Sequence, residues 1–93
     1  MLSGAPSLRT PQGVERLAPW DLVCFPPGPA GAHAVRNDTE AVARVLMFSS
    51  VRYPNVTTYP DSDKVGVWTG DRHQDLVVRR ASGVDYYDGE TQR

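Results

Sequence analysis

The chain has 93 residues, of which 40% are hydrophobic and 23% charged. This composition is that of a globular protein, and a chain of this length has room for one hydrophobic core, so we expect a single domain over residues 1–93. Ten Lys and Arg residues against eleven Asp and Glu residues give a formal net charge of −1, which argues against the basic surface of a nucleic-acid-binding protein or of a protein held at an anionic membrane.

Proline and glycine interrupt the chain throughout its length, with eight residues of each. The apolar stretches between them are about four to seven residues long, which is the usual length of a β-strand and too short for most helices. We therefore predict an all-β fold. The expected strands, in chain order, are Ser7–Thr10, Leu22–Phe25, Ala32–Arg36, Ala43–Ser49, Val56–Tyr59, Val65–Trp68, Leu76–Arg79 and Val84–Tyr87.

One segment, Asp38–Met47, approaches the length of a helix. Its first residues are suited to capping a helix, but the apolar and β-branched run that follows favours a turn at Asn37 and Asp38 and then a strand. The tight turn at 11–13 and the polar turns at 60–63 and 70–71 separate the other strands. The polar tail, residues 88–93, is expected to fray.

Membrane and disulfide signals are both missing from the sequence. The apolar runs are far too short to cross a bilayer, and no charged segment followed by an apolar one marks a signal peptide. Cys24 is the one cysteine, so the chain cannot form an internal disulfide, which is typical of a reducing compartment. We expect a cytoplasmic protein with neither membrane nor nucleic acid as a partner.

Two histidines, His33 and His73, are the candidates for imidazole chemistry. His33 follows a loop rich in proline and glycine and opens an expected strand, an arrangement that can hold a metal ligand on the inner wall of a barrel. The alternative is a partly buried imidazole that hydrogen-bonds to a loop carbonyl group. His73 lies among polar turn residues, where we expect it to be solvated.

The segment around His33 resembles the second sequence motif of the cupin superfamily. That motif has a leading glycine, a Pro-x-Gly in its centre and a His-x-x-x-Asn at its end, and the matching residues here are Pro26, Gly28, His33 and Asn37. Trp20 stands in the place of the leading glycine, and two extra residues separate Gly28 from His33. The likeness extends to small bacterial single-domain cupins and covers nearly the whole chain.

The resemblance implies an all-β cupin jelly roll, which is a double-stranded β-helix. Cupins that bind Mn, Fe, Ni or Zn use two histidines and a glutamate from an upstream motif, and this sequence has no His-x-His pattern. His33 is therefore the one metal ligand that the resemblance carries over, and a single imidazole binds a divalent metal weakly. Because the upstream motif would precede Met1, we expect the barrel to lack its first strands.

Two main hypotheses about function follow from the resemblance. The first is a cupin-domain protein that binds a small molecule or has a structural role, without catalysis by this chain. The alternative is a metal-dependent cupin enzyme of the dioxygenase, isomerase or decarboxylase type, which acts on a small organic substrate and has its other metal ligands in a missing upstream segment. A third, the sensor domain of a larger regulator, needs a DNA-binding segment that this sequence does not contain.

Self-association is the expected partnership. A barrel without its first strands leaves an open sheet edge that a second copy can cover, so we expect a homodimer. The aromatic side chains support this expectation, because they are more than a core of this size can bury. They are Tyr53, Tyr59, Trp68, Tyr86 and Tyr87.

Overall fold

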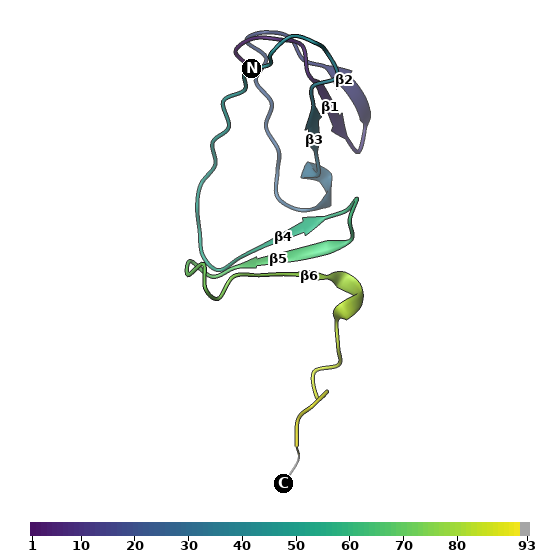
Figure 1. Cartoon of the computed structure of the whole chain (residues 1–93), viewed down its shortest axis with the longest axis vertical. Helices are drawn as coiled ribbons and strands as arrows, with labels where there is room; N and C mark the ends of the chain where they lie inside the picture. The colour runs from purple at the N-terminus through teal and green to yellow at the C-terminus, as the bar shows by residue number, and fades with distance from the viewer. Residues whose placement is uncertain (92–93) are drawn as a thin grey trace. The chain divides into compact units, whose positions relative to one another are not determined.

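The computed structural model describes residues 1–91 of the chain (Figure 1). Six β-strands and two single-turn 3₁₀ segments make up the regular structure of these residues, so the all-β prediction is confirmed. The chain divides into a first unit, Met1–Ser49, and a second unit, Ser50–Arg93, each held together by its own internal contacts. The expectation of one domain over residues 1–93 stays a prediction.

The first unit contains a three-stranded antiparallel sheet in the order β2-β1-β3. The central strand β1 (Ser7–Thr10) pairs with β2 (Gly13–Arg16) on one side and with β3 (Ala34–Arg36) on the other. A two-residue turn joins β1 to β2, and Gly13 ends it with a φ of 129°, a conformation that side chains disfavour. Leu8, in the middle of β1, is 1% exposed.

The core of the first unit is small. Its buried apolar side chains, among the residues that the structure describes, are Leu8, Leu17 and Pro6. The backbone N–H of Leu17 donates to the carbonyl oxygen of Pro6 at 2.9 Å, which extends the pairing of β1 and β2 beyond the strand ends. By the alternation of side chains along the strands, these three residues lie on one face of the sheet, where they form a small hydrophobic cluster.

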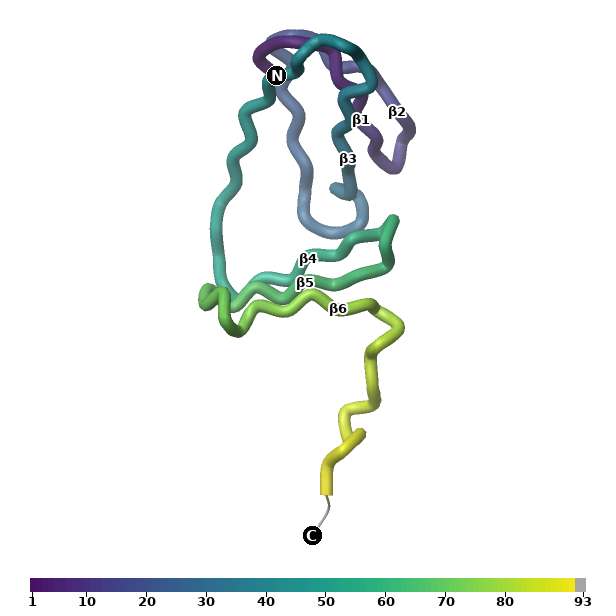
Figure 2. The backbone as a smooth tube through the Cα atoms, viewed as in Figure 1, coloured from purple at the N-terminus to yellow at the C-terminus, as the bar shows by residue number. Residues whose placement is uncertain are grey.

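The second unit contains a three-stranded antiparallel meander in the order β4-β5-β6, whose strands follow one another along the chain (Figure 2). Strand β4 comprises Asn55–Tyr59, β5 comprises Lys64–Trp68 and β6 comprises Leu76–Arg79. Turn residues 60–63 connect β4 to β5, with Asp63 at a φ of 51°. Asp and Asn tolerate this left-handed conformation better than most residues, which explains an aspartate at this position.

The 3₁₀ segments lie beside strands in each unit. The first, η1 (Pro29–Gly31), precedes β3, and the second, η2 (Arg80–Ser82), follows β6. Each sheet is open, with two edge strands, and neither closes into a barrel among the described residues.

Five of the eight expected strands are present, namely Ser7–Thr10 and Leu76–Arg79 with their predicted bounds and three others whose ends shift by one or two residues. The expected strand Leu22–Phe25 is wrong: the backbone there has no hydrogen-bonded neighbour, and Leu22 is 79% exposed. The expected strand Val84–Tyr87 is also wrong, because this segment turns, with the N–H of Asp88 donating to the carbonyl oxygen of Asp85 at 2.9 Å.

The expected strand Ala43–Ser49 is reduced to one isolated bridge between Ser3 and Arg44. The N–H of Arg44 donates to Ser3 and the N–H of Leu2 donates to Arg44, both at 2.9 Å. The pairing stops because the neighbouring chain turns at Gly4, where φ is 89° and an added Cβ would lie 2.7 Å from the Cα of Ala43. A strand requires a neighbour along its length, and here that neighbour is two residues long.

Strand β2 was not expected from the sequence, since it contains one large apolar residue, Val14, which is exposed. It forms because the tight turn at residues 11–13 brings the chain back along β1. The expected frayed tail, residues 88–93, includes Gln92 and Arg93, which lie outside the described residues. Within the rest of it, the N–H of Glu90 donates to the carbonyl oxygen of Tyr87 at 3.0 Å.

Candidate functional site

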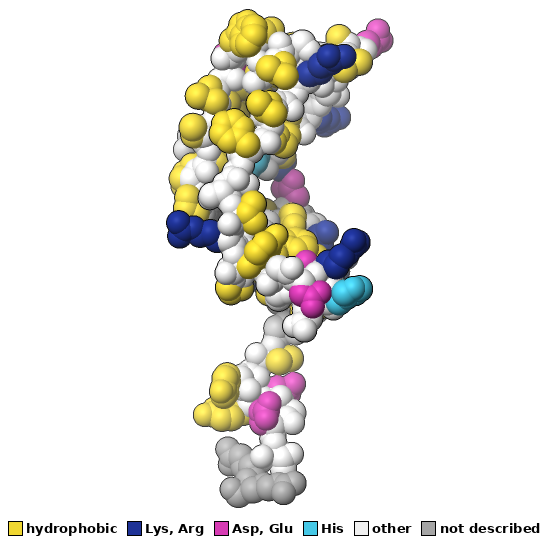
Figure 3. Space-filling view, turned by 90° about the vertical axis from the view of Figure 1, so that its left-hand side faces the viewer, with side chains coloured by type: hydrophobic (Ala, Val, Ile, Leu, Met, Phe, Trp, Pro, Cys, Tyr) yellow, Lys and Arg dark blue, Asp and Glu magenta, His cyan; other side chains and the backbone are white. Residues whose placement is uncertain are grey.

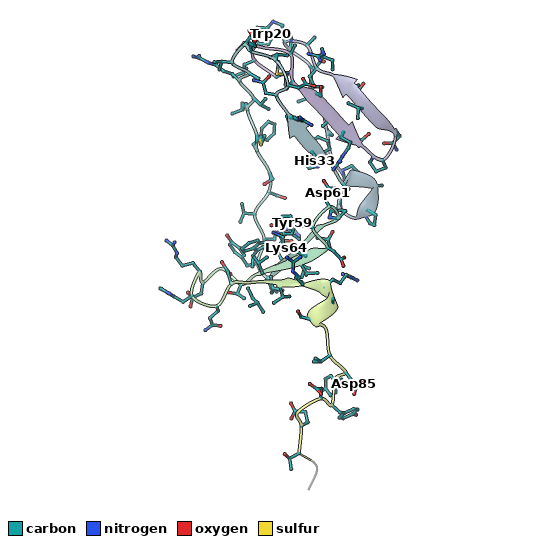
Figure 4. All side chains as sticks on the ribbon, turned by 45° about the vertical axis from the view of Figure 1, so that its right-hand side comes forward. Trp20, His33, Tyr59, Asp61, Lys64 and Asp85 are labelled. Atoms are coloured by element: carbon teal, nitrogen blue, oxygen red, sulfur yellow. The ribbon has the colours of Figure 1, made fainter. Side chains whose placement is uncertain are left out.

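The loop before β3 positions His33, the candidate metal ligand (Figure 4). Gly28 enters the loop with a φ of 88°, and Gly31 is buried so closely against Pro26 that an added Cβ would overlap the carbonyl oxygen of Pro26. The N–H of Gly31 donates to Gly28 at 3.0 Å, which closes the 3₁₀ turn. Glycine is therefore required at both positions, for conformation at one and for space at the other.

The imidazole of His33 is fixed by two contacts. Its Nδ1 lies 2.8 Å from the carbonyl oxygen of Gly31, and its ring stacks on Phe25 with centroids 3.5 Å apart and an angle of 8° between the planes. Because a carbonyl oxygen can only accept, Nδ1 carries the proton in this contact and Nε2 is the nitrogen left for another partner. The hydrogen bond to a loop carbonyl group that the sequence suggested is thus present, and metal binding by His33 stays a prediction.

The described residues do not supply a donor set for a catalytic metal. No three His, Cys, Asp or Glu side chains in residues 1–91 gather where they could hold an ion. A catalytic site in a protein generally takes about three protein ligands, so His33 fits as one ligand only. Cys24 is an exposed free thiol, and the backbone of His73 is held in a turn by a 2.9 Å hydrogen bond from its N–H to Asp71.

Asn37, the last residue of the cupin-like motif, organises a turn. Its Nδ2 donates to the carbonyl oxygen of Ala41 at 2.8 Å, and its Oδ1 accepts from the hydroxyl of Thr39 at 2.7 Å. These bonds close the loop that follows β3 and engage both polar atoms of the side chain. The role that the contacts support for Asn37 is therefore structural.

A polar cluster that the sequence did not reveal ties this loop to the first sheet. The hydroxyl of Ser7 donates to Asp38 at 3.2 Å, and Arg16 forms an ion pair with Asp38 at 3.5 Å. Ser7 and Arg16 face each other across β1 and β2, so the carboxylate of Asp38 meets both. Ser7 and Asp38 are 31 positions apart along the chain and meet through the pairing of the strands, so no local sequence pattern predicts their contact.

The second sheet has one apolar face and one aromatic face. Side chains alternate between the two faces along each strand, so the register places six residues together on the apolar face. The apolar face consists of Val56, Thr58, Val65, Val67, Leu76 and Val78. None of these side chains is buried, and Val56 and Leu76 are more than half exposed.

The aromatic face is covered by its own side chains. Trp68 lies across Gly66, where an added Cβ would be 2.7 Å from the indole ring, and its Nε1 donates to Thr57 at 2.8 Å. The ammonium group of Lys64 lies 5.4 Å from the ring centroid of Tyr59, a cation–π contact visible where the two residues lie side by side in Figure 4. Trp68 and Tyr59 thus contact residues of their own sheet, and an interface role for the aromatic side chains stays a prediction.

Large hydrophobic side chains are exposed in both units (Figure 3). In the first unit Leu22 is 79% and Phe48 is 81% exposed, and in the second unit Val56 is 62% and Tyr86 is 85% exposed.

Comparison with known proteins finds no match of this chain to a family model, to a curated protein or to a solved structure. The resemblance to cupins is thus carried by the motif residues alone. Among residues 1–91 there is also no helix with the length and apolar character needed to span a bilayer.

Proposed function

We propose that this chain is a cupin-type β-protein that works as a homodimer and that binds a small molecule or has a structural role, without catalysis of its own. The observation that carries the proposal is the exposed apolar surface. The large hydrophobic side chains buried within residues 1–91 are Leu8 and Leu17, and the apolar face of the second sheet is open. Exposed apolar surface of this extent is typical of an interaction surface.

The apolar character of the exposed surface favours a second copy as the partner. A stable dimer buries about 800 Å² on each protomer, and obligate dimers bury more and have apolar interfaces. The exposed large hydrophobic side chains of both units supply apolar surface for such an interface. A partner copy has the same low net charge of −1, so long-range repulsion does not oppose association.

The jelly roll, which is a double-stranded β-helix, is part of the same proposal. Short antiparallel strands in two sheets are the elements of which jelly rolls are built, and the matching motif residues Pro26, Gly28 and His33 lie in one loop of the first unit. The lone, exposed thiol of Cys24 supports a cytoplasmic location.

The geometry of His33 favours a second candidate function, a metal-dependent cupin enzyme acting on a small organic substrate. A histidine that ligates a metal commonly donates its other ring N–H to a carbonyl group, as Nδ1 of His33 does to Gly31. His33 would hold Mn, Fe, Ni or Zn weakly through Nε2, and the metal would act as a Lewis acid on a bound substrate. The described donor set fits one ligand, so this candidate ranks second.

Sedimentation velocity of the purified chain over a wide range of concentrations tests the proposal. A homodimer sediments with twice the monomer mass of 10.2 kDa, and the dimer fraction grows with concentration. A species that stays monomeric at the highest concentration would contradict the proposed dimer. Tight stoichiometric binding of a transition metal that requires His33 would instead favour the enzyme.

A further inference from the structure

Strand β6 (Leu76–Arg79) is an edge of the second sheet. The N–H of Arg80 donates to the carbonyl oxygen of Asp63 at 2.9 Å, so residue 80 points its backbone groups toward β5. In an antiparallel pair, successive residues direct their N–H and C=O groups to opposite sides. The backbone groups of Leu76 and Val78 therefore face β5, whereas those of Val77 and Arg79 are directed to the open edge. Asp75 offers its carbonyl group there, because its N–H donates to the carbonyl oxygen of Asp71 at 3.1 Å.

The opposite edge of the same sheet, β4 (Asn55–Tyr59), is protected. By the same alternation, the outward positions along β4 are residues 54, 56, 58 and 60. The first and last of these are Pro54 and Pro60, which have no N–H to offer to a further strand. Prolines and charges at sheet edges hinder the addition of another strand. Strand β6 has no proline and contains the apolar run Leu76, Val77 and Val78.

Charge and side-chain alternation select one register for a second copy at this edge. Residues that face each other in an antiparallel pair lie on the same face of the sheet, so a two-fold axis must pass through a residue. With the axis at Val77, Leu76 faces Val78 of the second copy, and Asp75 faces Arg79 of the second copy, twice by symmetry. With the axis at Arg79 instead, the two Arg79 side chains would face each other, and like charges in facing positions are unfavourable.

We propose that two copies of this chain join edge to edge through antiparallel pairing of β6, with Val77 on the two-fold axis. The pairing forms about four hydrogen bonds. Two join the Val77 residues, and one runs from the N–H of each Arg79 to the carbonyl oxygen of Asp75 in the other copy, since the N–H of Asp75 already donates to Asp71. The apolar faces of the two copies then lie on the same side of a six-stranded sheet, and Leu76 of each copy covers Val78 of the other at the seam. This interface deepens the proposed function, since it assigns the homodimer to one edge.

The side chains at the ends of β6 are suited to this role. Asp75 is held in place by the N–H of Thr69, which donates to its Oδ1 at 2.7 Å. Arg79 is exposed, and within residues 1–91 its side chain donates one long hydrogen bond, 3.4 Å to the carbonyl oxygen of Ser62. Asp75 is thus positioned beforehand, while Arg79 has the freedom to reach a carboxylate on another chain.

Two proline variants of the full chain test the proposed edge. Val77→Pro removes an outward N–H from β6, and Val56→Pro makes the same change at an outward position of β4. Both side chains are substantially exposed, at 47% and 62%, and neither N–H lies on the β5 side. We expect Val77→Pro to raise the dissociation constant of the dimer at least about tenfold, through lost hydrogen bonds and a clash at the axis, and Val56→Pro to leave it unchanged.

Light scattering after size exclusion provides the readout. A dimeric wild type with a monomeric Val77→Pro variant and a dimeric Val56→Pro variant supports the β6 interface. If both variants stay dimeric, the β6 interface is wrong while the proposed homodimer stands. If the wild type itself is monomeric at every concentration, both are wrong.

Crosslinking decides the question without proline, in case Val77→Pro fails to fold. In a Cys24→Ser background, Val77→Cys places two thiols across the two-fold axis, and copper phenanthroline should oxidise them to an interchain disulfide. Val56→Cys is the matched control and should stay uncrosslinked. Equal crosslinking at both positions, or none at Val77→Cys in a dimeric sample, would overturn the proposed register.

Discussion

The two sheets have the same number of strands but bury their central strands differently. In the first sheet, the middle of β1 carries Leu8, which is fully buried in a small cluster of the unit itself. In the second sheet, the buried residue at the middle of β5 is Gly66, covered by Trp68 from the same strand. The comparison indicates that the first unit buries apolar side chains of its own, whereas all six side chains on the apolar face of the second sheet are at least partly exposed.

The largest effect is expected at Leu8. Replacing it with alanine removes the main buried side chain of the first unit and should lower the free energy of unfolding by about 2–5 kcal/mol. Urea denaturation followed by circular dichroism measures the loss. Val35→Ala is the matched control, because Val35 faces Leu8 across β3 but is exposed. Equal losses for the two variants would show that Leu8 is not the core of this unit.

Gly66→Ala should have the next largest effect. The added Cβ would lie 2.7 Å from the indole ring, so Trp68 must move and lose its hydrogen bond to Thr57, at a cost of about 1–3 kcal/mol. The same substitution in a Trp68→Ala background should cost less, because the clash is gone. A double-mutant cycle measures this coupling, and additive losses would mean that Trp68 does not cover Gly66 in solution.

His33→Ala should cost about 0.5–1 kcal/mol, since it removes the stack on Phe25 and a hydrogen bond at an exposed position. Calorimetric titration of the metal-stripped wild type with Mn²⁺, Ni²⁺ and Zn²⁺ should give dissociation constants in the micromolar range or weaker, because one imidazole is the available ligand. His73→Ala is the control for the second imidazole. Nanomolar stoichiometric binding lost in His33→Ala would contradict the first proposed function.

The smallest effect is expected at Asp38. Asp38→Asn removes the ion pair with Arg16, but both side chains are about half exposed, and exposed ion pairs contribute about 0–1 kcal/mol. Thermal denaturation at low and high salt should therefore show a small loss that shrinks as salt screens the pair. A loss comparable to that of Leu8→Ala would show that the polar cluster, and not the apolar one, holds the first unit together.

Local signals in the sequence were sufficient for some elements and insufficient for others. Strands β1 and β6 have the predicted bounds, because the turn at residues 11–13 marks the end of β1 and the apolar run Leu76–Val78 identifies β6. Strand β2 depends on the turn that returns it along β1, and the segment Leu22–Phe25 has strand-like residues but no neighbour to pair with. Pairing between distant segments decides whether such a run becomes a strand.

The candidate site shows the same division. Local sequence predicts the loop that contains Pro26 and Gly28. It also predicts the hydrogen bond of His33 to a loop carbonyl group, since the bonded residues are two positions apart. The stack of Phe25 on His33 and the contact of Ser7 with Asp38 depend on how the chain folds back, and no local pattern signals them.

The concentration dependence of thermal unfolding tests the central claim most directly, namely that association stabilises the second unit. For a protein that folds with its partner, the midpoint rises with protein concentration because mass action favours the bound state. We predict that the midpoint of the wild type rises steadily over a hundredfold range of protein concentration. The midpoint of Val77→Pro should be the same at every concentration in that range. A wild-type midpoint that is independent of concentration would contradict the account.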